Sequence, residues 1–204
     1  MHSIEYKIVS RIYGRGRGWA FSQKDFASVG SRSSIDLALH CLVKKKTIRR
    51  VMRGVYDYPR YSDKLKKELS PNIDQVARAI ARKFGWRIQP SGSAALNILG
   101  LSTQVPGQYI YLSDGPDRSY TIRKTALIFR KTATKESGFK YHESSIVVQA
   151  LKSLGKEQIT PQVITAIRKW LDPGLRSKIL KDTQTVTGWV YDAIRNISRE
   201  SHIG

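Results

Sequence analysis

The chain has 204 residues, 40% of them hydrophobic, which is enough to bury the core of one large domain or of two small ones. Lys and Arg number 36 against 16 Asp and Glu, and this net charge of +20 favours a polyanionic partner, either nucleic acid or an acidic protein surface. No apolar run approaches the roughly 18 residues of a membrane-spanning helix, and we find no signal peptide. Cys41 is the single cysteine, so the chain has no disulfide framework. We therefore expect a cytoplasmic protein with no membrane partner.

The positive charge is spread along the whole chain. Residues 1–64 hold 14 Lys and Arg against 5 Asp and Glu, and the remaining excess lies beyond residue 64. The second part of the chain is therefore basic too, and it either adds contacts to nucleic acid or faces an acidic partner.

The first 30 residues predict two short helices and a strand around a basic loop. Apolar residues at helical spacing predict a helix over 2–13, and 19–21 favours a strand. The loop 14–18 alternates Gly and Arg, but it has neither the preceding strand nor the Lys-Ser/Thr ending of a P-loop, so it either contacts a phosphate backbone or merely connects. Ser22 and Asp25 form a capping-box variant that opens a short helix.

Residues 31–58 carry the most informative pattern, which is a helix, a short basic turn and a two-stranded hairpin. Ser31 is a good N-cap, because its hydroxyl can accept a hydrogen bond from a backbone N–H of the first turn. The run Lys44–Lys46 ends the helix, where cations suit the negative end of the helix dipole. The hairpin follows, with Arg53-Gly54 as its turn. The apolar face of the helix consists of Ile35, Ala38, Leu39, Leu42 and Val43.

The order of these elements is typical of a winged helix-turn-helix, so we predict a DNA-binding domain of that kind over residues 1–60. The helix that begins after Ser31 would enter the major groove, and the hairpin, or wing, would touch phosphates or the minor groove. Winged-helix modules also serve as protein-interaction domains, and that alternative stays open.

A polar segment with a proline at each end, residues 59–72, is the predicted linker to a second domain over 71–204. Residues 71–131 predict a small α+β unit with a mostly antiparallel sheet, and a helical period returns from residue 143. The fold class is therefore α+β: an N-terminal winged helix-turn-helix followed by a small mixed α/β domain and C-terminal helices. The predicted helices of the second domain are 71–84, 94–99, 143–154, 160–171, 173–180 and 187–197, and its predicted strands are 86–89, 109–112, 119–122 and 127–131.

The sequence offers little that could act as a catalytic or metal site. Four scattered histidines and one cysteine cannot build a zinc site, and the H-E-x-x-H, G-x-S-x-G and P-loop motifs are absent. Asp114 and Asp117 are better explained as turn formers. Gly92-Ser93 is similar to the opening of a nucleotidyltransferase site, but Ala94 and Ala95 stand where that chemistry needs metal-holding acids. We expect no enzyme activity, no cofactor and no metal.

Three runs of sequence resemble the AbiEi-like antitoxins of bacterial type IV toxin–antitoxin systems, over roughly residues 4–200. They are GWAFSQKDF, LVKKKTIRRVMRGVYDYPRYS and, above all, QPSGSAALNILGLSTQVPGQYIYLSDGP, and the likeness is closest to the branch whose C-terminal domain has no assigned function. The resemblance implies that the winged helix binds operator DNA and represses the operon. It also implies that the C-terminal domain opposes a nucleotidyltransferase-like toxin, which it need not contact directly, and that it helps in repression.

The predicted DNA contacts lie on the helix after Ser31 and on the wing. Arg32 is the best candidate for a base or phosphate contact, and Arg53, at the tip of the wing, would enter the minor groove. The other serines, lysines and arginines would contact phosphates or base edges, and His40 is a weaker candidate. The full set is Lys24, Ser31, Arg32, Ser33, Ser34, His40, Lys44, Lys45, Lys46, Arg49, Arg50 and Arg53.

One module reads a short site, so we expect two copies on an inverted repeat of double-stranded DNA, by dimerisation or by cooperative binding. Several rival functions stay open at this point. They are a winged-helix transcriptional regulator without a toxin partner, an RNA-binding protein, a protein-interaction module, and a nuclease or nucleotidyltransferase with an unfamiliar site.

Overall fold

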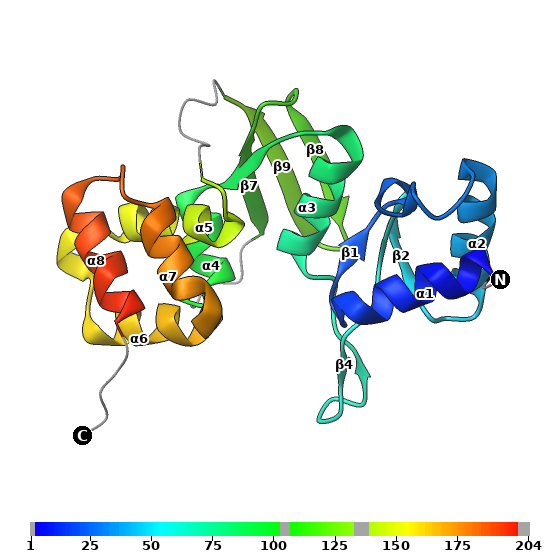
Figure 1. The fold of residues 1–204 in the computed structure, drawn as a ribbon, viewed down its shortest axis with the longest axis horizontal. Helices are drawn as coiled ribbons and strands as arrows, with labels where there is room; N and C mark the ends of the chain where they lie inside the picture. Colours follow the sequence, from blue (N-terminus) through cyan, green and yellow to red (C-terminus); the bar gives the residue numbers. More distant parts are fainter. Residues whose placement is uncertain (1–2, 103–106, 133–138, 200–204) are drawn as a thin grey trace. The chain divides into compact units, whose positions relative to one another are not determined.

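The computed structural model describes residues 3–102, 107–132 and 139–199, which form a mixed α and β fold with eight α-helices (Figure 1). The chain divides into two compact units. Unit 1 comprises Met1–Trp86 with Thr121–Arg123, and unit 2 comprises Arg87–Tyr120 with Lys124–Gly204.

Unit 1 is built around a three-stranded antiparallel sheet in the order β1-β3-β2. Its main core lies between α1, α2, η1 and this sheet, where Ile8, Phe21, Phe26, Leu39 and Leu42 are at most 1% exposed. The elements in chain order are α1 (Ile4–Arg15), β1 (Ala20–Phe21), the 3₁₀ helix η1 (Gln23–Phe26), α2 (Arg32–Lys44), β2 (Arg49–Met52), β3 (Val55–Asp57), β4 (Tyr61–Ser62), β5 (Lys67–Glu68) and α3 (Ile73–Phe84).

Both caps predicted in this unit are confirmed. Ser31 caps α2, since its Oγ accepts from the Ser34 N–H at 3.3 Å. The Ser22 N–H donates to Oδ2 of Asp25 at 2.8 Å, as a capping box requires. These bonds fix where η1 and α2 begin, and so they fix which side chains stand at the start of each helix.

The segment predicted as a linker has a different structure. Residues 61–68 form a small antiparallel hairpin of β4 and β5, with Tyr61 opposite Glu68, and Figure 1 shows it projecting from the three-stranded sheet. Its strands of two residues each are too short to show the alternating pattern by which a strand is recognised.

The boundary between the compact units also lies later than the predicted start of the second domain at residue 71. Helix α3 belongs to unit 1, where it packs against β1, η1 and β3. Arg82 fastens it there, because its Nε donates to Oδ1 of Asp25 at 2.6 Å and its Nη2 donates to the carbonyl oxygen of Ala20 at 2.8 Å. The division falls between Trp86 and Arg87.

Unit 2 combines a group of helices with a four-stranded sheet in the order β6-β7-β9-β8, in which the last two residues of β8, Thr121 and Ile122, are assigned to unit 1. Strand β6 pairs antiparallel with β7, whereas β7 pairs parallel with β9, so the sheet that we expected to be mostly antiparallel includes a parallel pair. Tyr111 and Phe129 face each other across the parallel pair and are fully buried. The strands are β6 (Ile88–Pro90), β7 (Gln108–Ser113), β8 (Arg118–Ile122) and β9 (Thr125–Lys131).

The helices of unit 2 gather on one side of this sheet (Figure 1) and bury a second core. Val147, Leu151, Ile167, Val190 and Ile197 in that core are fully buried. Thr160 caps α6, since its Oγ1 accepts from the Val163 N–H at 3.4 Å. The helices are α4 (Gly92–Ile98), α5 (His142–Leu154), η2 (Lys156–Gln158), α6 (Pro161–Trp170), α7 (Pro173–Asp182) and α8 (Gly188–Ser198). Within the described ranges, none combines the length and apolar character needed to cross a bilayer.

Candidate nucleic-acid interface

A hollow of about 560 Å³ on unit 1 is surrounded by positive charge. Four elements line it: the start of α2, η1, the β2–β3 hairpin and the last turn of α3. The described lining includes one acid, Asp36, whose carboxylate lies 4.0 Å from Nε of Arg32. The cations of the hollow are Lys24, Arg32, Arg50, Arg53 and Lys83.

Each of these cations is placed by a local feature of the chain. Arg32 is the first residue of α2, directly after the Ser31 cap, and its side chain is 86% exposed. Arg50 lies on β2, and Arg53 precedes Gly54, whose φ of +73° closes the hairpin turn. The positive end of the α2 dipole reinforces the side-chain charges, since the N-terminus of a helix attracts anions. The arrangement suits a phosphate backbone.

Lys83 joins the hollow from α3. Its Nζ donates to the carbonyl oxygen of Arg53 at 3.3 Å, and a Cβ added to Gly54 would lie 2.7 Å from the same nitrogen. Burial lowers the pKa of Lys83 below its ordinary value, and the charge of Arg53 lowers it further. Lys83 is absent from the contacts predicted from the sequence, because its helix was expected to belong to the second domain. The signal was the Arg82-Lys83 pair in the last turn of an amphipathic helix.

Aromatic side chains border the same hollow. Tyr56 and Phe84 line it, and Phe84 is 47% exposed. The Phe84 ring stacks on Trp86, with a distance of 4.8 Å between the ring centroids, and Nζ of Lys83 lies over the Phe84 ring. Exposed rings among cations are a combination that nucleic-acid-binding surfaces use for stacking.

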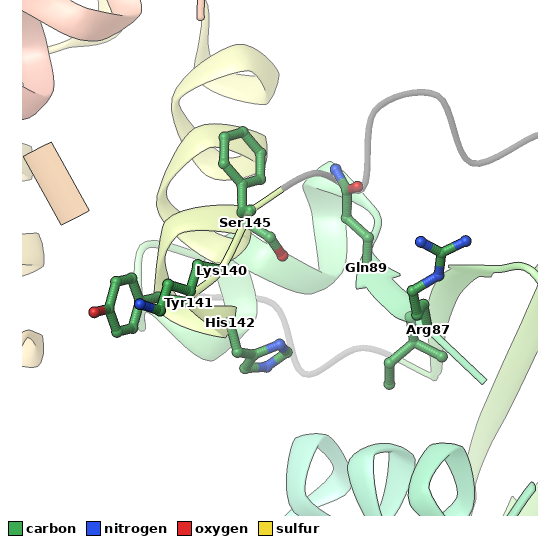
Figure 2. A pocket seen from close by; sticks show the side chains of 8 residues that line it. Arg87, Gln89, Lys140, Tyr141, His142 and Ser145 are labelled. Carbon is green, nitrogen blue, oxygen red and sulfur yellow. The ribbon is translucent and has the colours of Figure 1, made fainter. Parts of the chain in front are cut away.

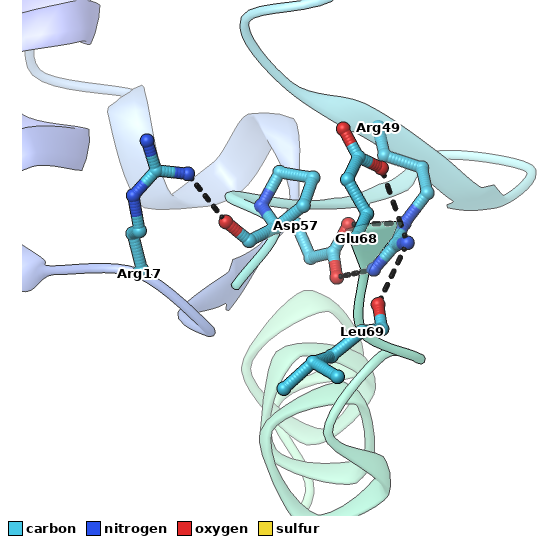
Figure 3. Close-up of polar contacts among 6 residues, drawn as sticks. Arg17, Arg49, Asp57, Glu68 and Leu69 are labelled. Carbon is cyan, nitrogen blue, oxygen red and sulfur yellow. Dashed lines mark hydrogen bonds and ion pairs between the residues drawn. The ribbon is translucent and has the colours of Figure 1, made fainter. Parts of the chain in front are cut away.

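Arg49 does not fit the role predicted for it, because its guanidinium is turned to other groups within unit 1 (Figure 3). It donates through Nε and Nη2 to the two carboxylate oxygens of Asp57, at 3.0 and 2.6 Å, and through Nη1 to the carbonyl oxygen of Leu69 at 3.0 Å. Glu68 lies 3.5 Å from the same Nη1. Since Arg49 is only 17% exposed, it is a structural residue and not a phosphate contact.

Asp57 is the reason for this arrangement. Its side chain is 2% exposed, and burial raises the pKa of Asp57, while the hydrogen bonds and charge of Arg49 lower it. A carboxylate this deeply buried needs a charged partner. Arg49 supplies it and, through Glu68 and Leu69, also holds the base of the β4–β5 hairpin.

The remaining predicted contacts are not brought into the hollow. The run Lys44–Lys46 is exposed at the opposite end of α2 from Arg32, and His40 is exposed between them. Lys45 forms an ion pair with Glu5, whose hydrogen bond and charge raise the pKa of Lys45. Ser31 is occupied as a cap, and its Oγ lies within 3.1 Å of the hydroxyls of two neighbouring serines, Ser33 and Ser34. Of the predicted set, Lys24, Arg32, Arg50 and Arg53 line the hollow.

The basic loop after α1 connects two parts of unit 1. Nη1 of Arg17 donates to the carbonyl oxygen of Pro59 at 2.8 Å (Figure 3), and its guanidinium carbon lies 4.7 Å from the centre of the Tyr58 ring. The Gly18 N–H donates to the carbonyl oxygen of Tyr58 at 2.6 Å. Of the two interpretations left open, these contacts favour a connection.

The part of the chain that the structure describes contains no group of three His, Cys, Asp or Glu side chains placed to hold a metal ion.

Comparison with known proteins places the chain in a family. Residues 7–179 match a family of unknown function (DUF6088), and the chain belongs to that family. No curated protein matches the sequence. The crystal structure of the RV2827C protein from Mycobacterium tuberculosis is similar to the chain, with a TM-score of 0.40 and 9% identity over 96% of this chain and 76% of that chain.

Proposed function

We propose that unit 1 binds duplex DNA as a winged helix-turn-helix, and that the chain is an antitoxin and transcriptional autorepressor of a type IV toxin–antitoxin operon. The observation that carries DNA binding is the hollow of unit 1, where five cations from four elements surround the start of α2. The order of helix, strand, short helix, helix and hairpin in unit 1 supports the same proposal.

In this proposal α2 enters the major groove, with its exposed face toward the bases. Ser33, Leu37 and His40 lie on that face, and Leu37 is 65% exposed, which suits contact with a thymine methyl group. Arg50 and Arg53 neutralise phosphates from the hairpin, and Lys83 adds a contact from α3. Duplex DNA is favoured over RNA because a helix flanked by a basic hairpin fits the open major groove of B-form DNA, whereas the major groove of RNA is deep and narrow.

The antitoxin part of the proposal depends on the resemblance of the sequence to the AbiEi-like proteins. It assigns to unit 2 the task of opposing a nucleotidyltransferase-like toxin. Ala94 and Ala95 are buried core residues of α4, at the positions where a nucleotidyltransferase would carry acids that hold metal, which fits the antitoxin and not the toxin.

The test of DNA binding is fluorescence anisotropy with a duplex from the region upstream of the protein's own gene. A scrambled duplex and an RNA of equal length serve as controls, and each is titrated across salt. We expect the upstream duplex to stay bound at salt concentrations that release both controls. Equal binding to all three would overturn sequence-specific repression, and stronger binding to RNA would overturn the choice of DNA.

Variants of the hollow make the test specific for the site. Replacing Arg50, Arg53 or Lys83 with Gln should reduce the slope of log affinity against log salt by about 0.9 for each phosphate that the variant no longer neutralises. Lys7→Gln is the matched control, because it removes the same charge from an exposed position on α1, outside the hollow. An equal effect of Lys7→Gln and Lys83→Gln would show that net charge, and not the hollow, governs binding.

The antitoxin role needs a separate measurement. Where a nucleotidyltransferase-like gene lies beside the gene for this chain, it is expressed under an inducible promoter with and without this chain. Growth restored by the chain, including by a variant that no longer binds DNA, supports the antitoxin role. Specific DNA binding without any rescue would leave a transcriptional regulator with no toxin partner.

A further inference from the structure

A second hollow, of about 220 Å³, lies within unit 2 where the start of α5 faces β6 (Figure 2). On one side it is lined by Gln89 of β6 and by Arg87, which directly precedes β6. On the other side it is lined by His142 and Ser145 of α5 and by Lys140, which lies in the segment before α5. Among the residues that the structure describes, none of those lining it is acidic. The volume is below the roughly 300–1,000 Å³ of pockets for drug-sized ligands, so the hollow suits a small molecule.

Ser145 is the unusual residue of this hollow. It is 7% exposed, and its Oγ has no hydrogen-bond partner among the described residues. Figure 2 shows its hydroxyl directed to the side where Gln89 lies, across the hollow. Buried hydroxyl groups are nearly always hydrogen-bonded, so an unpartnered one at the wall of a hollow indicates that a bound group completes it.

The charges around Ser145 define what that group is. Lys140 is exposed beside the hollow, where its Nζ lies 5.7 Å from the centre of the Tyr141 ring, and Arg87 brings a second cation. The Nε of Arg87 donates to Oδ2 of Asp114 at 2.9 Å, and the backbone N–H of Arg87 donates to Oδ1 of the same carboxylate at 2.8 Å. These two bonds fix the position of the guanidinium, and Asp114 itself does not line the hollow. Helix α5 begins at His142, three residues before Ser145, and the carboxylate of Asp182 already accepts from the N–H groups that lead into it.

Asp182 keeps the segment before α5 in position. Its carboxylate accepts from the N–H groups of Lys140 and Tyr141, at 2.9 and 3.0 Å, and from the Ser144 hydroxyl at 2.6 Å. Ser144 therefore has its partner on the α7 side, whereas its neighbour Ser145 faces the hollow and has none among the residues described. Of these two adjacent buried serines, Ser144 has a hydrogen-bond partner for its hydroxyl and Ser145 has none among the described residues.

We propose that this hollow binds the phosphate group of a small ligand. The Ser145 hydroxyl donates to a phosphate oxygen from the buried wall. Arg87 and Lys140, whose exposed side chain moves from the Tyr141 ring to the ligand, balance the charge of the phosphate. The site is independent of the DNA-binding surface of unit 1, and it gives unit 2 a ligand of its own.

The experiment is a titration of the ¹⁵N-labelled full chain with inorganic phosphate, followed by NMR at constant ionic strength, with chloride as the reference anion. We expect saturable shifts of the backbone amides at residues 140–145. Ser145→Ala should weaken binding at least about tenfold, the loss expected for one hydrogen bond to a charged group. Amide shifts at the hollow of unit 1 would report phosphate binding there, and they are not evidence for the site in unit 2.

Lys140→Gln is a second variant, in case Ser145→Ala disturbs the fold. It changes an exposed side chain, so the fold should be unaffected, and we expect it to weaken phosphate binding as well. Lys152→Gln, on an exposed position of α5 outside the hollow, should leave the affinity unchanged. A nucleoside monophosphate added in a parallel titration separates the sources of the phosphate: tighter binding than inorganic phosphate identifies a nucleotide, and equal binding identifies free phosphate. Shifts that never saturate, or that are the same in Ser145→Ala and in the unaltered chain, would overturn the proposal.

Discussion

Neighbouring arginines of one strand have separate tasks in this protein. Arg49 is turned to the buried Asp57, while Arg50 lines the cationic hollow. Successive side chains of a strand point to opposite faces, so two adjacent arginines cannot both face the same partner. Both were predicted as DNA contacts, because the sequence does not show which one faces inward in a hairpin whose register shifts between Arg50 and Met52.

The first prediction at this scale separates the two arginines by stability. Arg49→Ala leaves Asp57 buried without its charged partner, and we expect it to lower the free energy of unfolding by about 3–5 kcal/mol. Arg50→Ala changes an exposed side chain and should shift stability by no more than about 0.5 kcal/mol.

Urea denaturation measures both effects, and anisotropy on the same samples should give the reverse order for DNA affinity. A stable Arg49→Ala variant that has lost DNA binding would contradict the structural role of Arg49.

The second prediction concerns acid stability and Asp182. Burial alone would raise the pKa of Asp182, but the Ser144 hydroxyl and the N–H groups of Lys140 and Tyr141 hold it below its ordinary value. A carboxyl with a lowered folded-state pKa stabilises the fold at any pH above its unfolded pKa, about 3.9. That contribution is lost as the pH falls through the lower folded-state value.

Asp182→Asn should therefore reduce stability at pH 7 and flatten the loss of stability below about pH 4. The measurement is the urea midpoint of unit 2 between pH 2 and 7. If the curve of the variant runs parallel to that of the unaltered chain in acid, Asp182 is not the titrating group.

At the scale of elements, the sequence pattern predicted helix α3 but not the unit against which it packs. Its apolar positions predicted a helix over 71–84, and the helix spans Ile73–Phe84, with Asn72 as its cap. Val76, Ala77 and Ile80 are fully buried. An amphipathic pattern shows that a face must be covered, but not what covers it, so the pattern did not place α3 in unit 1.

A third prediction follows from the place of α3. A fragment ending at residue 86 should fold, because it keeps the helix that packs on β1, η1 and β3, whereas one ending at residue 70 should be largely unfolded. Circular dichroism and dispersion of the amide NMR signals report the difference. Native-like spectra of the shorter fragment would show that α3 is dispensable for unit 1.

The helices of unit 2 and the pairing of its strands differ in how well the sequence predicts them. The helices of unit 2 were predictable, because Thr160 and Thr187 mark where α6 and α8 begin and their apolar residues keep a helical period. The pairing of β7 with β9 was not, because local sequence does not encode which strand lies beside which. Of the cationic hollow, four members were predicted, and Lys83 was missed because the tertiary packing that brings it there is not visible in the sequence.

At the scale of the whole molecule, each compact unit buries a hydrophobic cluster of its own among the described residues. Ile12 is fully buried in the core of unit 1, and Leu151 is fully buried in the helical core of unit 2. Each is a point at which one unit can be weakened without touching the other.

The fourth prediction uses this division. Ile12→Ala and Leu151→Ala should each cost about 2–5 kcal/mol, as large-to-small changes in a core do. Hydrogen exchange should show faster opening confined to unit 1 for the first variant and to unit 2 for the second. Equal acceleration in both units by either variant would mean that the molecule unfolds as one cooperative body.

The parallel pairing of β7 with β9 has a consequence for synthesis on the ribosome. Unit 1 is formed almost wholly by the first 86 residues, so it can fold while the rest of the chain is still being made. Strand β7 ends at Ser113, but its second neighbour, β9, is complete only at Lys131. One edge of β7 therefore stays unpaired until β9 has emerged from the exit tunnel, and this is the interval in which a nascent chain is most exposed to pairing with another.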